Sequence, residues 1–223
     1  MNKLITELKE EILSIVTGNT LDAMLPPLVF VIVNRLATLN MALITGLLFA
    51  VLLGIVRLMK KQDWRYAFGG MIGLLFTSVL VYATQSAANY FIPKLLSSGF
   101  GFLLTIISLI IGKPIAAFVS HLTRGWRLEW FWRDDIKPAY REVSVLWGLY
   151  FMIRLMILST LYIKGDIWGL FWMNTLLGGP AILTVLIISY IYGIWRLKTL
   201  EGPGIDEFNE GVDPPWRGQT RGF

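Results

Sequence analysis

Long apolar runs separated by short polar segments dominate the chain. Five of them have, or approach, the length of about 20 residues that an α-helix needs to cross a hydrocarbon layer about 30 Å thick: residues 41–59, 67–83, 95–111, 143–163 and 167–195. A sixth run, residues 21–36, is shorter and holds two prolines. None alternates apolar and polar residues as a half-buried strand does. The pattern therefore predicts an all-α, polytopic integral membrane protein with about six transmembrane helices.

Glycine and proline interrupt these runs at three places. They are Pro26-Pro27, Gly112-Lys113-Pro114 and Gly178-Gly179-Pro180. Proline removes a backbone donor and disfavours the helix in front of it, so each cluster predicts a break. The third break lies inside the sixth run, where it would free backbone carbonyls near the middle of the span.

The segments outside the spans have three different characters. Residues 1–19 carry apolar side chains on one broad face and predict an amphipathic helix at the inner membrane surface. The spans occupy residues 20–199, and residues 121–140 within them form a loop rich in tryptophan and arginine. Residues 200–223 are rich in glycine and proline and have few aliphatic residues. Such a tail needs an outside surface to become ordered, either its own inner loops or a neighbouring subunit.

Composition supports the membrane class. Of 223 residues, 55% are hydrophobic and 16% are charged, against about 45–50% apolar and about 25% charged in soluble domains. The net charge of +5 is spread along the chain in loops between spans, so it does not indicate a nucleic-acid partner. With six spans and an inner N-terminus, sixteen of the twenty lysines and arginines fall on one side. By the positive-inside rule both termini are expected in the cytoplasm.

One charged residue lies inside a span. Arg154 stands halfway along residues 143–163, where burying a charge costs about 2.5–3.5 kcal/mol on insertion scales. We expect it to face the protein interior and to form an intramembrane polar cluster with Asn174 and Asn34. This cluster is interpreted as an interhelical clamp, and the alternative is a polar relay or substrate site.

Small residues follow one face of the second span. Ala42, Gly46, Ala50 and Gly54 are each four residues apart, which lets helix backbones approach closely. Gly69 and Gly73 continue the pattern in the third span. We interpret this stripe as packing between spans two and three, with docking to another subunit as the alternative.

Aromatic residues outside the spans suggest two further roles. Trp126, Trp130 and Trp132 are expected to anchor the inner loop in the membrane interface. Phe208, Trp216 and Phe223 are the expected anchors by which the tail binds a partner. The single histidine, His121, stands at the inner edge of the fourth span and is a weak candidate for holding a cofactor.

Catalytic signatures are missing from the sequence. It has no cysteine, no phosphate-binding glycine loop, no H-E-x-x-H and no G-x-S-x-G. We therefore expect no enzyme activity, no metal site and no cofactor. The expected partners are membrane lipids and other membrane protein subunits, and no nucleic acid is expected.

Several short motifs occur along the chain in an order that resembles a known family. They are Leu25-Pro26-Pro27-Leu28-Val29-Phe30, Gly112-Lys113-Pro114, Leu146-Trp147-Gly148-Leu149-Tyr150-Phe151, Ile167-Trp168 and Tyr190-Ile191-Tyr192. Over about residues 20–200 the chain resembles the bacterial intracellular septation protein A family and a related, largely uncharacterised family of multi-span proteins. The resemblance implies a bacterial inner-membrane protein that organises the envelope or septum through protein contacts. It supplies no catalytic residues.

Three functions follow as hypotheses. The leading one is a non-enzymatic scaffold or accessory subunit that docks to a larger membrane assembly, with septum organisation as one setting. The second is a transporter of small solutes or lipids built around Arg154 and Asn174. The third is an accessory subunit of a respiratory or photosynthetic complex.

Overall fold

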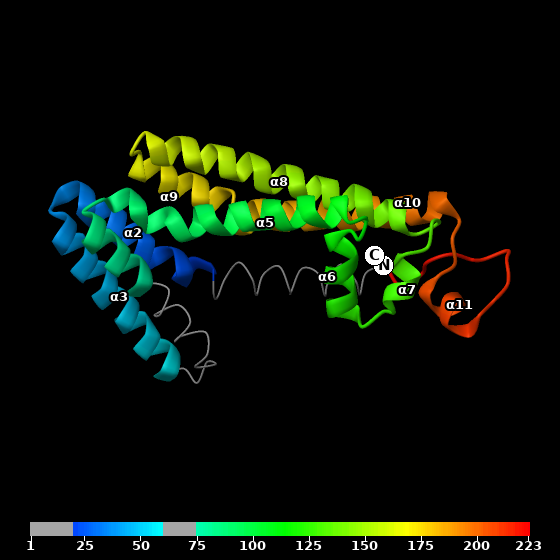
Figure 1. Ribbon diagram of the computed structural model, residues 1–223. Coiled ribbons are helices and arrows are strands. Elements are labelled where there is room, and N and C mark those ends of the chain that lie inside the picture. Colours follow the sequence, from blue (N-terminus) through cyan, green and yellow to red (C-terminus); the bar gives the residue numbers. More distant parts are fainter. Residues whose placement is uncertain (1–19, 60–74) are drawn as a thin grey trace. The chain divides into compact units, whose positions relative to one another are not determined.

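The computed structural model describes residues 20–59 and 75–223 (Figure 1). The expected amphipathic helix at residues 1–19 lies outside this part of the chain. Every regular element within the described residues is a helix, which confirms the all-α class. The elements are α2 (Thr20–Leu36), α3 (Leu39–Met59), an apolar helix at Leu75–Thr84, the 3₁₀ turn η2 (Ala87–Phe91), α5 (Ile92–Ile110), α6 (Ile115–Arg124), α7 (Leu128–Phe131), α8 (Lys137–Ile163), α9 (Ile167–Leu176), α10 (Gly179–Leu200) and α11 (Ile205–Glu210).

Four helical segments of the described chain are long and apolar enough to cross a membrane. They are Leu39–Val56, Ala87–Ile110, Lys137–Ile163 and Ile167–Leu200. The first and third expected spans appear as the shorter apolar helices Leu25–Leu36 and Leu75–Thr84. The chain therefore has membrane-helix character, and the count of six spans stays a prediction.

The three glycine and proline clusters behave differently. Helix α5 ends at Ile110 and α6 begins at Ile115, as the second cluster predicts. The third cluster also breaks its span: α9 ends at Leu176, and a turn at residues 177–178 precedes α10. The break expected at Pro26-Pro27 is wrong, because α2 continues through both prolines. The residues that follow them, Phe30 and Val31, are buried in a core that holds the helix together.

The chain divides into two compact units, which are described separately. The first comprises Met1–Leu95 and Leu158–Gly179, and the second comprises Leu96–Ile157 and Pro180–Phe223. In the first unit α2 and α3 form a hairpin (Figure 1), and Phe30 of α2 stacks on Tyr90 at a ring-centroid distance of 4.6 Å. The buried side chains Phe91, Leu158 and Phe171 complete its core. Polar contact is provided by Tyr162, whose hydroxyl donates to Oδ1 of Asn89.

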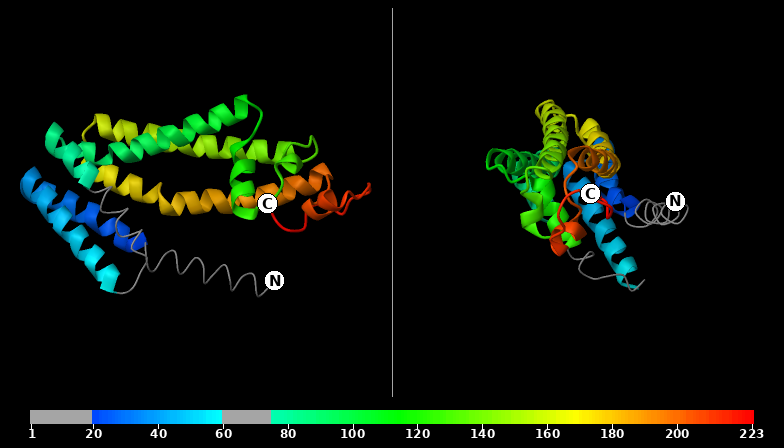
Figure 2. Two further views of the ribbon diagram at one scale, coloured as in Figure 1. Left: turned by 60° about the horizontal axis from the view of Figure 1, so that its bottom comes forward. Right: turned by 90° about the vertical axis from the view of Figure 1, so that its right-hand side faces the viewer.

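In the second unit α5, α8 and α10 run side by side (Figure 2). The β-carbon of an alanine at Gly101 would lie 2.7 Å from the ring of Phe151, so glycine is what allows α5 and α8 to approach this closely. Between α8 and α10, Nε1 of Trp147 donates to the hydroxyl of Ser189 at 2.9 Å. These three helices support a lobe made by α6, α7, α11 and residues 200–223, where the chain's candidate site lies.

Candidate functional site

The lobe of the second unit is built on an aromatic core from α7 and the start of α8. Trp130, Phe131 and Tyr140 are fully buried, and their rings meet edge to face at centroid distances of 4.8–6.1 Å. Gly125 ends α6 with φ +70°, a left-handed conformation that suits glycine, and its N–H donates to the carbonyl of His121. This cap turns the chain so that α7 packs beneath α6.

The tail folds onto this core. Nε1 of Trp130 donates to the carbonyl oxygen of Pro203 at 2.9 Å, and Ile205 is buried beside it. Phe223 stacks on Tyr140 with ring centroids 4.3 Å apart and an interplanar angle of 13°. The Phe223 ring also lies directly on the backbone of Gly193 in α10, where a β-carbon would overlap it. Of the two surfaces expected to order the tail, the structure shows the chain's own segments α7, α8 and α10.

Glu207 organises the return of the tail. Its carboxylate accepts three backbone N–H groups, from Arg217 at 2.7 Å, Gly204 at 2.8 Å and Gly218 at 3.1 Å. These hydrogen bonds favour the charged form, and they lower the pKa of Glu207 below its ordinary value. Oε1 of Gln219 accepts a further backbone N–H, from Ile205 at 3.1 Å. One carboxylate thus closes the loop between α11 and the last residues.

The loop that Glu207 closes projects from the lobe. Residues 209–215, which we call the tail loop, are all exposed, and Val212 keeps 43% of its surface in contact with solvent. At its base Nε1 of Trp216 donates to the carbonyl of Val212 at 2.8 Å. The guanidinium of Arg133 lies 5.2 Å from the centroid of the Trp216 ring and forms two hydrogen bonds to Asp135, at 2.7 and 2.9 Å. These hydrogen bonds raise the pKa of Arg133 above its ordinary value.

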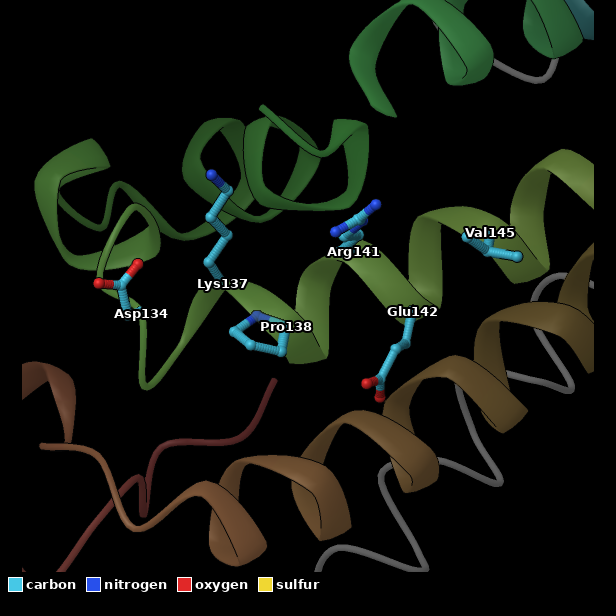
Figure 3. A pocket seen from close by; sticks show the side chains of 6 residues that line it. All are labelled: Asp134, Lys137, Pro138, Arg141, Glu142 and Val145. Atoms are coloured by element: carbon cyan, nitrogen blue, oxygen red, sulfur yellow. The ribbon is translucent and has the colours of Figure 1, made fainter. Parts of the chain in front are cut away.

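A polar network joins α8 to α10 next to the lobe. The carboxylate of Glu142 accepts Nε of Arg196 at 2.8 Å, Nη2 of Arg196 at 3.1 Å and the hydroxyl of Tyr192 at 2.6 Å. An open cleft of about 460 Å³ lies along the start of α8 (Figure 3). Figure 3 shows Lys137 and Arg141 on the side of α8 opposite Glu142. The residues that line the cleft are Asp134, Lys137, Pro138, Arg141, Glu142 and Val145.

The expected polar cluster is divided between the two units. Asn34 and Asn174 belong to the first unit and Arg154 to the second. All three side chains are half-buried, and Nε of Arg154 is shielded from solvent. Their association as a cluster stays a prediction.

The small-residue stripe of α3 contacts α2 at one position. Ala42, Gly46, Ala50 and Gly54 are buried, as expected. A β-carbon at Gly46 would lie 3.5 Å from Cβ of Phe30, so at this position α3 packs on α2. Packing of the stripe on the third span stays a prediction. The short connection between α2 and α3 makes them the closest neighbours. Gly69 and Gly73 lie outside the described residues.

The expected tryptophan and tail anchors contact protein. Trp126 and Trp130 are buried in the lobe and so face protein, whereas Trp132 is half-buried against Phe118. Phe208 and Phe223 pack against the same lobe. Trp216 lies at the edge of the tail loop.

His121 has a local structural partner. Its Nδ1 lies 2.6 Å from the carbonyl oxygen of Trp126, and because a carbonyl only accepts, Nδ1 carries the proton. Within the described ranges no three acidic or histidine side chains gather in a group able to hold a metal ion.

Three residues that hold the lobe together are not indicated by the sequence pattern: Tyr140, Gly193 and Glu207. Only Glu207 had a usable signal, since an acidic residue three positions after a glycine can close a helix start. Gly193 looks like any other glycine in an apolar run, because the residue that packs on it, Phe223, is thirty residues away in the sequence.

Comparison with protein-family models matches residues 17–198 to the family described as "Protein of unknown function (DUF3159)". The chain belongs to the DUF3159 family. Within the second unit the match includes Tyr140, Glu142, Gly193 and Arg196 and ends before the tail. Comparison with curated proteins and comparison with solved structures both give no match.

Proposed function

We propose that this DUF3159 protein is a non-enzymatic membrane scaffold or accessory subunit that binds partner proteins through its tail loop. The observation that carries the proposal is the way the tail is held. The buried contacts of Trp130, Ile205 and Phe223 fix both ends of residues 200–223, while residues 209–215 stay exposed. A loop ordered before binding loses less conformational entropy when it meets a partner than a disordered tail does.

The composition of the tail loop favours a protein partner. It presents Val212 next to Asp213 and the Pro214-Pro215 pair, and the indole of Trp216 donates a hydrogen bond to the carbonyl of Val212 at its base. Aromatic and apolar groups with a polar rim are typical of small protein-binding surfaces. The small-residue stripe of α3 supports this choice indirectly, because at Gly46 it is occupied by α2 of the same chain.

We place the protein in the bacterial inner membrane with six spans and both termini in the cytoplasm, so that the lobe and the tail loop face the cytoplasm. The lysine and arginine bias supports this orientation. The resemblance to septation protein A makes organisation of the envelope or septum one setting for such a scaffold.

Site-specific photo-crosslinking tests the scaffold in living cells. A photoreactive amino acid is placed at Val212, and a matched control is placed at Lys164, an exposed residue beyond the far end of α8. We expect one protein to be crosslinked from position 212 and not from 164. Tagging that protein should recover this chain, and Val212→Asp should abolish the recovery. If only lipid is crosslinked at both positions, the scaffold hypothesis fails.

A transporter is the second candidate function. The interruption at residues 177–178 favours it, because unwound backbone within a span frees carbonyl groups for a substrate. In that case Arg154→Lys or Asn174→Ala should remove solute flux in proteoliposomes while the protein still folds. A scaffold predicts no flux for any of these proteins.

A further inference from the structure

One ridge of α8 begins with two cations and continues with exposed apolar residues. Lys137 and Arg141 are four residues apart, and Val145, Leu149 and Ile153 follow at the same interval. Residues spaced by four form one continuous row on a helix surface. The three apolar side chains expose 44%, 47% and 50% of their surface. The row therefore has a charged end and a long apolar part.

The charged end is electrostatically positive. It borders the open cleft of about 460 Å³, which Glu142 and Asp134 also line. The charge of Glu142 is balanced by the ion pair with Arg196, and its carboxylate points toward α10, away from the two cations (Figure 3). Within the described residues neither Lys137 nor Arg141 forms an ion pair. Of the two carboxylates that line the cleft, only that of Asp134 is exposed.

The length of α8 places this charged end at the edge of the bilayer. With a rise of 1.5 Å per residue, its 27 residues extend roughly 40 Å, whereas the hydrocarbon layer is about 30 Å thick. The apolar run of α8 begins at Val143, so the first six residues extend into the headgroup layer. Val145, Leu149 and Ile153 then lie at the depth of the acyl chains.

We propose that this ridge binds an anionic phospholipid. Lys137 and Arg141 hold its phosphate in the cleft, and an acyl chain lies along Val145, Leu149 and Ile153. A guanidinium and an ammonium are the donors that proteins use for phosphate, and here they stand at headgroup depth. The continuous apolar row selects an amphiphile over a soluble phosphate, which would use only the charged end. Among the described residues no carboxylate pairs with either cation, which favours an anionic lipid over a zwitterionic one that brings its own cation.

Native mass spectrometry of the full chain in detergent tests the site. The delipidated protein is titrated with phosphatidylglycerol, and separately with phosphatidylcholine and with glycerol 3-phosphate. We expect one phosphatidylglycerol to bind more tightly than the other two probes. At roughly fivefold for each cation, Lys137→Gln with Arg141→Gln should weaken that binding about 25-fold. The matched control Lys164→Gln removes a cation beyond the opposite end of α8 and should leave binding unchanged.

Two further variants separate binding from folding. Arg141→Lys keeps the charge and should retain binding within about threefold, and Leu149→Gln alters only the apolar part and should weaken phosphatidylglycerol but not glycerol 3-phosphate. The proposal is overturned if the double variant binds phosphatidylglycerol like the unaltered chain, or if phosphatidylcholine binds equally well. It is also overturned if glycerol 3-phosphate binds as tightly as the lipid. None of these residues belongs to the tail loop, so the scaffold proposal is tested independently.

Discussion

Replacing Gly193 by alanine is expected to detach the end of the tail while leaving α10 intact. The new β-carbon would overlap the ring of Phe223, which is held between Gly193 and Tyr140. The overlap involves ring atoms Cγ, Cδ2 and Cε2, so a rotation of the ring does not relieve it. Phe223 must leave its place. Alanine is also the better helix former, so α10 itself is stabilised by about 0.5–1 kcal/mol.

The cost of detachment can be worked from the contacts of Phe223. Its half-buried ring accounts for about 1–2 kcal/mol of the roughly 1.5–3 kcal/mol that full burial of a phenylalanine contributes. Stacking on Tyr140 adds about 0.5–1.5 kcal/mol. The helix gain applies equally to the docked and detached states, so it does not offset this loss. We therefore expect the free energy of tail opening to fall by about 2 kcal/mol, which is about a 30-fold change in the open population.

Trypsin cleavage after Arg217 and Arg221 measures this opening, because both arginines lie in the docked tail. When opening is fast compared with cleavage, the cleavage rate follows the open population. The rate should rise about 30-fold in Gly193→Ala and by a similar factor in Phe223→Ala. In the double variant the overlap no longer exists, so it should match Phe223→Ala. An unchanged rate in Gly193→Ala, or a double variant cleaved much faster than Phe223→Ala, would refute the packing argument.

Three further predictions concern other contacts. Trp130→Phe keeps most of the ring but leaves the buried carbonyl of Pro203 without its donor, so the lobe should lose about 1–3 kcal/mol of stability in a near-ultraviolet dichroism melt. The pKa of Glu207 is lower in the folded protein than in the unfolded chain. The ionised carboxylate therefore stabilises the docked tail fully above the unfolded pKa, and this stabilisation is lost as the pH falls through the folded pKa. The fluorescence of Trp216 in the tail should therefore change on acidification, and Glu207→Gln should remove that pH dependence. Gly46→Ala should be tolerated because its β-carbon meets Phe30 at an ordinary contact distance. Gly46→Leu overfills the α2–α3 contact and should cost about 1–3 kcal/mol of stability, seen as a lower melting temperature in detergent.

The helices were predictable because membrane spans are local features. The expected runs at residues 41–59, 95–111 and 143–163 correspond to α3, α5 and α8 with shifts of a few residues. Two of the three breaks also followed from glycine and proline. The break predicted at Pro26-Pro27 does not form, because burial of Phe30 and Val31 outweighs the lost backbone hydrogen bonds, and burial cannot be read from a proline pair.

The site was harder to predict, because its residues have meaning only in pairs that are distant in the sequence. The sequence predicts a membrane anchor at Trp130, whereas its indole donates to the carbonyl of Pro203, seventy-three residues away. Phe223 was recognised as an anchor, but the sequence left open whether its partner was this chain or another.

The sequence by itself determined that the chain is helical, apolar and built to cross a membrane, because hydropathy and backbone hydrogen bonding act over neighbouring residues. Only the tertiary structure decided that the tail docks on its own lobe, that Gly193 makes room for Phe223, and that Lys137 and Arg141 begin an apolar ridge beside an occupied Glu142. These facts depend on which surfaces meet in space. That choice is made by shape and by the pairing of buried polar groups, and neither has a period that can be read along the chain.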